Sequence, residues 1–277
     1  MAIPSASCLL FLLSSILFLL TPPSIANDNN IMLTGDVLGP DDELSYLDTT
    51  LTMQIDCNLV LYHYKGTPAF DSSTYDRGVV NCSVALNEHG QFVISDPNGN
   101  TIWVSGRPGR KGTYAAVLQP DKQVGIYGPV VWSTSNLGST KYAMVDDEDE
   151  AIPTVKNTLF SSEIIADGAE LTTRDYRFIM DESCSLELRK SDLYIWVSGT
   201  VGRGQHCFLR LNRRGQLTIK DDMYKTIWST DPSPDGVGDY VLILQFNGQA
   251  AVYGPLIWST GDDGQIIYPA VSPAPTY

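Results

Sequence analysis

A run of alternating side chains early in the sequence carries groups that can grip a sugar. Along residues 54–62, every second position contributes to this set, namely Gln54, Asp56, Asn58, Val60 and Tyr62. Side chains of an extended strand alternate between two faces, so the spacing predicts that all five point to one side. Carboxylate and amide oxygens accept from sugar hydroxyls, amide nitrogens donate to sugar oxygens, and valine can cover the C–H patch of the ring. The run therefore predicts a carbohydrate site that needs neither an acid–base pair nor a metal.

The residues between these five predict the opposite face of the same strand. Ile55, Cys57, Leu59 and Leu61 fall on that face, which is expected to pack into a core. The simpler alternative is an alternating strand whose polar face is only solvated.

The run belongs to a sequence that repeats itself. Cys57 and Cys82 recur as Cys184 and Cys207, about 126 residues later, and a Tyr-Gly-Pro triplet recurs at the same offset. The chain therefore divides into two homologous halves. Each pair of cysteines encloses a comparable loop at the same place in its half, which predicts the disulfides Cys57–Cys82 and Cys184–Cys207.

Each half repeats again around aromatic residues. Short alternating runs, separated by Gly, Asn, Asp and Pro, predict strands rather than helices and hence an all-β fold. Three aromatic-marked segments in each half predict pseudo-threefold symmetry, with the rings packed together on the internal axis. The aromatic residue of the first segment is Phe70, and those of the other five are Trp103, Trp132, Trp196, Trp228 and Trp258.

At residues 54–62 the chain resembles the bulb-type, or monocot mannose-binding, lectins, whose signature is Gln-x-Asp-x-Asn-x-Val-x-Tyr. The resemblance extends over most of the sequence as a tandem duplication. It implies two tandem β-prism domains, each with three four-stranded sheets. It also implies that Asp56 and Asn58 contact the axial 2-hydroxyl of mannose, Gln54 the 3-hydroxyl and Tyr62 the 4-hydroxyl, with Val60 packed on the ring.

The other five segments depart from this signature. The third segment keeps Gln119, Asp121 and Tyr127 and predicts a weak or vestigial sugar site, because Gln123 is a methylene longer than asparagine and Gly125 removes the apolar contact. The remaining sets keep two signature residues or fewer. These sets are Asn87, His89, Gln91, Val93 and Ser95; Asp181, Ser183, Ser185, Glu187 and Arg189; Asn212, Arg214, Gln216, Thr218 and Lys220; and Gln245, Asn247, Gln249, Ala251 and Tyr253.

The ends of the chain and its middle predict processing and export. Residues 1–26 are uncharged, contain a short apolar block and end in Ser24-Ile25-Ala26, as in a signal peptide. We expect lectin domains over 27–140 and 157–262, an acidic linker over 141–156, and a C-terminal tail or propeptide over 263–277. Export and two disulfides predict a vacuolar or extracellular protein.

Composition and motifs also predict what the chain does not do. A formal net charge of −14 disfavours nucleic acid as a partner. The histidines lack metal-ligand spacing, no cofactor motif is present, and pairing of the cysteines leaves no catalytic arrangement, so we expect neither an enzyme nor membrane insertion. Asn81-Cys82-Ser83 is a formal N-glycosylation sequon.

Two functions remain from the sequence. The first is a lectin for mannose-containing glycans, acting as a homo- or hetero-oligomer in plant defence or storage. The second is a storage or protein-recognising protein built on the same scaffold without sugar binding.

Overall fold

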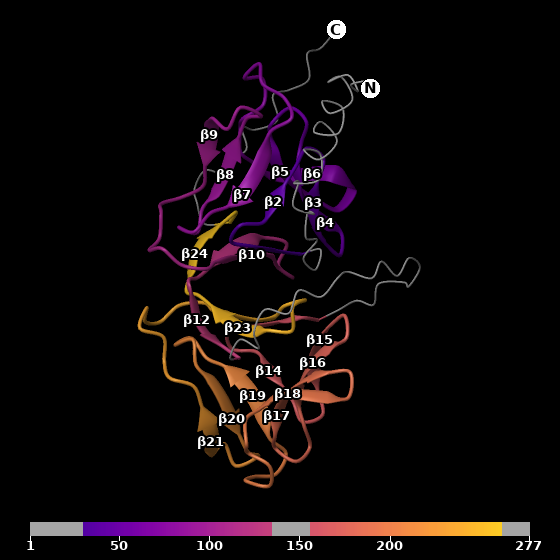
Figure 1. Cartoon of the computed structure of the whole chain (residues 1–277), viewed down its shortest axis with the longest axis vertical. Helices are drawn as coiled ribbons and strands as arrows, with labels where there is room; N and C mark the ends of the chain where they lie inside the picture. The colour runs from indigo at the N-terminus through magenta and orange to yellow at the C-terminus, as the bar shows by residue number, and fades with distance from the viewer. Residues whose placement is uncertain (1–29, 135–155, 262–277) are drawn as a thin grey trace, which may run out of the picture.

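The computed structural model describes residues 30–134 and 156–261. These residues form two stacked units, each built from three four-stranded antiparallel sheets (Figure 1). The only helical element among them is the short 3-10 turn η1 (Tyr64–Gly66). The predicted all-β fold with two pseudo-threefold β-prisms is confirmed.

The first unit comprises residues 30–127 together with 256–261. Its three sheets contain the following strands in spatial order. The first has β3 (Glu43–Tyr46), β4 (Thr49–Met53), β5 (Leu59–His63) and β6 (Thr67–Asp71). The second has β2 (Val37–Leu38), β7 (Ser83–Leu86), β8 (Phe92–Ser95) and β9 (Thr101–Val104). The third has β1 (Ile31–Leu33), β10 (Ala115–Leu118), β11 (Val124–Tyr127) and β24 (Leu256–Ser259).

The second unit comprises residues 130–134 and 156–253. Its sheets repeat the arrangement of the first unit. One has β15 (Glu170–Thr173), β16 (Tyr176–Met180), β17 (Leu186–Lys190) and β18 (Leu193–Val197). The next has β14 (Ile164–Ile165), β19 (Phe208–Leu211), β20 (Leu217–Lys220) and β21 (Thr226–Ser229). The last has β12 (Val130–Ser133), β23 (Ala250–Tyr253), β22 (Val241–Leu244) and β13 (Thr158–Phe160).

The two units exchange one strand each. β24, from the end of the sequence, pairs with β11 in the first unit, whereas β12 pairs with β23 in the second unit. The structure thus places β12, from the predicted first domain 27–140, in the second unit, and β24, from the predicted domain 157–262, in the first. The repeat could not reveal this, because a strand has the same pattern whichever equivalent sheet it joins. The predicted signal peptide and tail, and most of the linker, lie outside the described residues.

Aromatic rings fill the axis of each unit, as predicted, although one ring comes from the exchanged strand. In the first unit, the ring of Phe70 lies 6.4 Å from that of Trp103 and 5.8 Å from that of Trp258 on β24. In the second unit, Trp132 on β12 packs against Trp196 and Trp228, with ring centroids 5.9 and 6.4 Å away. The rings of Trp196 and Trp228 lie 6.0 Å apart. Each exchanged strand therefore supplies part of the other half's core.

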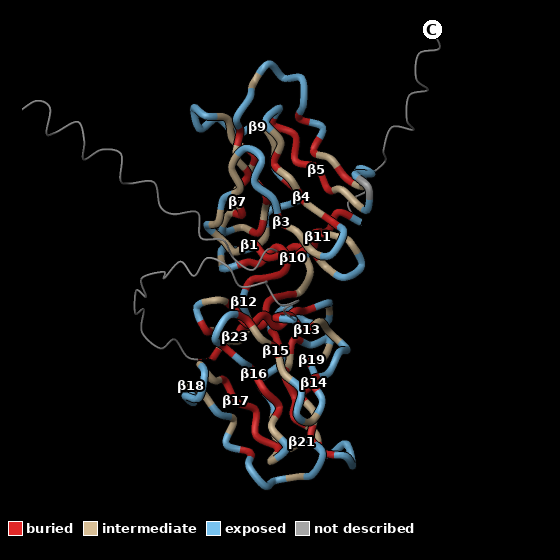
Figure 2. The backbone as a smooth tube through the Cα atoms, turned by 90° about the vertical axis from the view of Figure 1, so that its right-hand side faces the viewer, coloured by how far each residue is buried: buried red, intermediate tan, exposed pale blue. Residues whose placement is uncertain are grey.

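The third sheets of the two units pack face to face. All residues of β10, β11, β22 and β23 are buried, without the alternation expected of a strand that has one solvated face. Their inner faces pack into the unit cores. Their outer faces form a shared apolar cluster that includes Val117, Tyr127, Ile243 and Tyr253. Buried positions accordingly extend across the contact between the units (Figure 2).

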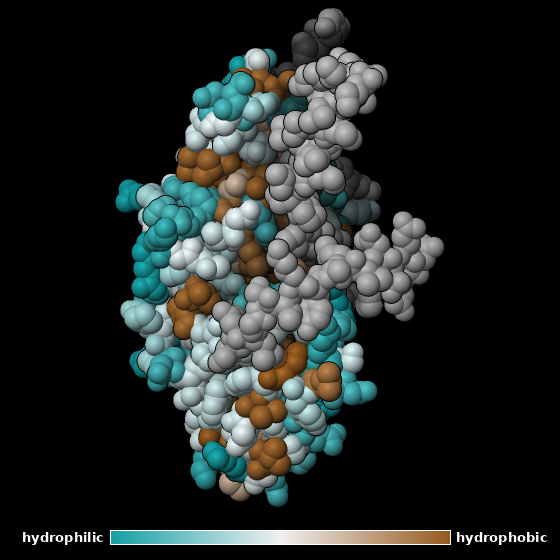
Figure 3. Space-filling view, viewed as in Figure 1, coloured by the Kyte–Doolittle hydropathy of each residue, from teal (hydrophilic) through white to brown (hydrophobic). Residues whose placement is uncertain are grey.

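The disulfides pair as the repeat predicted, Cys57 with Cys82 and Cys184 with Cys207. All four cysteines are fully buried. On the visible face of the molecule, apolar side chains form small separate groups among hydrophilic ones (Figure 3). The buried apolar clusters lie in the two cores and between the units.

Candidate functional site

The signature run does not form one continuous strand. Residues Gln54–Asn58 make a tight turn between β4 and β5, closed by a hydrogen bond from the Gln54 N–H to the Asn58 carbonyl at 2.9 Å. Cys57 adopts a left-handed conformation with φ of 72°. The prediction that Ile55 faces the core is therefore wrong, and its side chain is 49% exposed. The turn reverses the chain before β5 begins, so strand alternation applies only from Leu59 onward.

The turn nevertheless brings the five signature side chains together, and we call them the first site. Gln54 Nε2 donates to the Tyr62 hydroxyl at 2.8 Å, which bridges the start of the turn to β5. Asp56 Oδ1 accepts from the Asn58 N–H at 3.0 Å. Because the Tyr62 oxygen accepts from Gln54, its hydroxyl proton is available to donate to a ligand.

Asn58 is the most firmly held member of the first site. It is buried, and its Oδ1 accepts from Ser72 Oγ at 3.0 Å and from the Thr74 N–H at 3.2 Å. Both acceptor positions of the amide oxygen are thereby used. The group that Asn58 can offer to a ligand is its Nδ2, which donates. This fixes a donor beside the exposed carboxylate of Asp56, whose Oδ2 accepts no hydrogen bond within the described residues.

Val60 forms the floor of the first site. It lies on the face of β5 opposite Leu59 and Leu61, which belong to the core cluster of the first unit. Val60 is only 3% exposed, and its cross-strand neighbours are Thr52 and Asp71. The first site is thus a shallow surface with a methyl floor, a carboxylate, an amide donor and a phenol. Such a surface can bind adjacent hydroxyls, and nothing in it is placed for acid–base or nucleophilic chemistry.

The predicted vestigial site in the third sheet is closed by the second unit. Tyr127 is 2% exposed and its ring packs 6.3 Å from that of Phe160 on β13. Its hydroxyl donates to Gln119 Oε1 at 2.7 Å, and burial raises the pKa of this phenol. Asp121 makes the same turn hydrogen bond as Asp56, because its Oδ1 accepts from the Gln123 N–H at 3.0 Å. Because the face of Tyr127 is enclosed, this sheet offers a sugar no surface at the tyrosine.

Known proteins resemble the chain over most of its length. No protein-family model matches it. Mannose-specific lectin 1 of Crocus vernus is 48% identical over 249 residues, which is 88% of this chain and 91% of that protein. The chain belongs to the monocot mannose-specific (bulb-type) lectin family.

Further relatives agree with this membership and with the fold. Mannose-specific lectin 2 of Colocasia esculenta is 41% identical over 266 residues, covering 94% of this lectin and 97% of that one. The structure of a fetuin-binding agglutinin from Scilla campanulata, described as a two-domain lectin, superposes with a TM-score of 0.74 at 28% identity. It covers 83% of this lectin and 99% of that chain. Membership of a lectin family confirms the expectation that the chain is not an enzyme.

In the second unit of this lectin, an ion pair replaces the floor of the first site. Glu187 stands where Val60 stands in the first unit, is 5% exposed and accepts from Arg189 Nε at 2.8 Å. The Arg189 guanidinium also lies 4.5 Å from the ring centre of Tyr194. Hydrogen bonding and the Glu187 charge raise the pKa of this guanidinium, which stays charged. A buried carboxylate paired with a partly exposed guanidinium gives a sugar ring no apolar contact, in agreement with the loss of the signature here.

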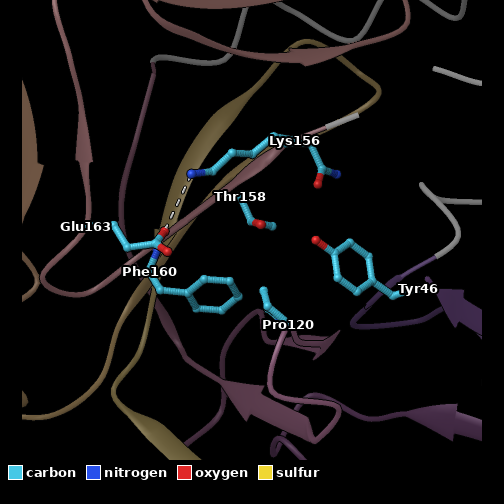
Figure 4. Close-up of a pocket in the computed structure, with 7 residues that line it drawn as sticks. Tyr46, Pro120, Lys156, Thr158, Phe160 and Glu163 are labelled. Atoms are coloured by element: carbon cyan, nitrogen blue, oxygen red, sulfur yellow. Dashed lines mark hydrogen bonds and ion pairs between the residues drawn. The ribbon is translucent and has the colours of Figure 1, made fainter. Parts of the chain in front are cut away.

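A pocket of about 220 Å³ lies between the units and was not anticipated from the sequence (Figure 4). Tyr46 and Pro120 line it from the first unit, facing Thr158 and Phe160 of the second. Lys156 Nζ lies 3.9 Å from a carboxylate oxygen of Glu163 at its rim. Packing of two units creates this pocket, so no local sequence pattern could predict it.

Three further predictions concern metal ligands, membrane insertion and glycosylation. Within residues 30–134 and 156–261, no three His, Cys, Asp or Glu side chains gather as metal ligands. No helix in the same residues is long and apolar enough to cross a membrane. Asn81 of the sequon is exposed beside the disulfide-bonded Cys82, and its glycosylation stays a prediction.

Proposed function

We propose that this lectin binds mannose-containing glycans through Gln54, Asp56, Asn58, Val60 and Tyr62. The observation that carries the proposal is the first site, where a complete signature gathers around an exposed carboxylate with its donors and acceptors already fixed. The relatives named mannose-specific lectins support the same ligand. A storage or protein-recognising protein without sugar binding has no comparable support.

The hydroxyl partners follow from the groups that each side chain leaves free. Asp56 offers carboxylate oxygen as an acceptor, Asn58 offers Nδ2 as a donor, and Tyr62 offers its hydroxyl proton. A charge-assisted hydrogen bond contributes about 1.5–3 kcal/mol, so Asp56 supplies most of the affinity of a weak site.

Retention on mannose-agarose, with elution by free mannose, tests the proposal. Asp56→Ala should abolish retention. Asp121→Ala is the matched control, because Asp121 makes the same backbone hydrogen bond in an equivalent turn, on a sheet where the second unit encloses Tyr127. Asn247→Ala, in the corresponding turn of the second unit, should also change retention little. Retention of Asp56→Ala at the parental level, with its fold intact, would remove the first site from the proposal.

A single site of this kind binds a monosaccharide weakly, so useful avidity requires several sites on one particle. We therefore propose that the lectin acts as an oligomer, and that it is exported to the vacuole or the extracellular space. The two disulfides support export, since they persist in oxidising compartments. Mass spectrometry of the mature protein should find an N-terminus near Asn27, and retention of residues 1–26 would contradict the export.

A further inference from the structure

One sheet of the second unit differs in chemistry from its counterpart in the first unit. The hairpin β19-β20 has the same register as β7-β8, with Phe208↔Lys220 and Arg210↔Thr218 in place of Ser83↔Ser95 and Ala85↔Val93. The intervening Leu209 and Ile219 are fully buried, so these four residues point outward. The outer face of the first-unit hairpin is uncharged, whereas that of the second carries two cations. We call the surface formed by Phe208, Arg210, Lys220 and Tyr224 the basic face.

On its own sheet, the basic face occupies the positions that the sugar surface occupies on the β4-β5 hairpin of the first unit. Val60 and Tyr62 of the first site pair across the strands with Thr52 and Thr50. On the basic face, Thr218 and Lys220 stand at the positions of Val60 and Tyr62, and they pair across the strands with Arg210 and Phe208. The exchange of neutral for charged residues therefore falls on the surface where this fold presents its ligand-binding side chains.

Neither cation has a carboxylate partner among the described residues. In the part of the chain that the structure describes, no carboxylate oxygen lies within 4 Å of the Arg210 or Lys220 side chain. On the adjacent sheet, by contrast, the Arg177 side chain is paired with Glu170 at 2.7 Å. Diagonal neighbours of this kind have Cα atoms about 7–8 Å apart, so the two cationic side chains leave the sheet from neighbouring positions on one face. Two neighbouring cations that make no ion pair with the described residues fit an anionic ligand.

An aromatic pair, formed by the half-buried Phe208 and the exposed Tyr224, lies beside these charges. The rings of Phe208 and Tyr224 meet edge to face, with centroids 5.7 Å apart, and Tyr224 is 70% exposed. Tyr224 has φ of 61° in the loop before β21, at the place where the first unit has Gly99. A bulky side chain is uncommon in this conformation, which glycine adopts without strain. The loop thus presents a ring to solvent where the counterpart has no side chain.

We propose that the basic face binds a carboxylate-bearing saccharide, with a uronate oligosaccharide as its ligand. Arg210 and Lys220 pair with the carboxylates, and the exposed ring of Tyr224 covers the C–H face of a pyranose ring. A short uronate fits better than a long polyanion, because the net charge of −14 repels extended negative chains away from this face. The basic face lies on a different unit from the first site, so this inference does not depend on mannose binding.

Titration calorimetry of the full chain with trigalacturonate, and with neutral galactotriose as the matched ligand, tests the proposal. The parent should bind trigalacturonate and not galactotriose. Arg210→Ala and Lys220→Ser install the first-unit residues and should each weaken binding about tenfold, as expected for loss of one charge-assisted contact. Tyr224→Gly, which installs the glycine of the counterpart loop, should weaken binding without unfolding the second unit.

Two controls separate this site from general charge effects and from the first site. Lys111→Ala removes one positive charge from the first unit and should leave trigalacturonate affinity within twofold of the parent. Asp56→Ala should lose mannose binding and keep trigalacturonate binding. Undiminished binding by the Arg210→Ala/Lys220→Ser double variant, absence of binding to trigalacturonate, or equal binding of galactotriose would each overturn the proposal. Equal binding of triglutamate would overturn it in favour of an acidic peptide ligand.

Discussion

Replacing Trp258 by alanine should loosen the first unit, although this residue lies near the end of the sequence. Trp258 is 6% exposed on β24 and packs against Phe70 and Phe92 with centroids 5.8 and 5.9 Å away. Removal of a buried tryptophan costs about 3–5 kcal/mol. For a unit of roughly 100 residues, this lowers the melting temperature by more than about 12 °C.

Hydrogen exchange followed by mass spectrometry can assign this loss to one unit. In Trp258→Ala, amides of β5 should exchange about a hundredfold faster or more, whereas those of β17 should change little. Trp132→Ala is the matched variant. Trp132 lies in the first half of the sequence but packs against Trp196 and Trp228. Its replacement should therefore speed the exchange of the β17 amides and leave the β5 amides protected. Faster exchange of β17 in Trp258→Ala, with β5 unchanged, would refute the exchange of strands.

Three further outcomes are expected. Replacing Cys57 and Cys82 together by serine should lower the free energy of unfolding of the first unit by roughly 3 kcal/mol in denaturant titrations, because the unfolded chain loses its cross-link. Burial raises the pKa of the Tyr127 and Tyr253 phenols above the ordinary value of 10.0, so their contribution to stability should be lost as the pH rises above that value. Melting curves between pH 9 and 11 should show this loss, and the Tyr127→Phe/Tyr253→Phe variant should show less of it. Proteolytic cleavage within 135–155 should leave the two pieces together in size-exclusion chromatography, since each holds a strand of the other's sheet; separation without denaturant would contradict this.

The sequence predicted the fold class, both disulfides and the aromatic axis because each depends on a repeated local pattern. It did not predict the turn at Gln54–Asn58. Alternation of polar and apolar residues continues through this turn, and the left-handed residue is Cys57 rather than a glycine that would have marked it. Equivalent turns do have a glycine at that position, as at Gly90 and Gly215, and comparing the repeats would have revealed the pattern.

The features that the sequence did not predict arise from contacts between the halves. Enclosure of Tyr127 depends on Phe160 in another unit, and the exchanged strands have equivalent sequences that fit either partner. One local pattern in the sequence did indicate the contact between the halves. β10, β11, β22 and β23 are apolar without alternation, which is typical of strands buried on both faces.

The exchange of β12 and β24 frees the two units to evolve apart. If two identical chains paired through the same strands, every substitution would be made twice, and each interface residue would have to fit a copy of itself. Within one chain, each side of the interface has to fit only its dissimilar partner. Because both units belong to one chain and are therefore present in equal number, one unit can retain a complete sugar signature while the other acquires charged outer faces. Different ligand chemistries can then be carried at a fixed one-to-one ratio by a single molecule.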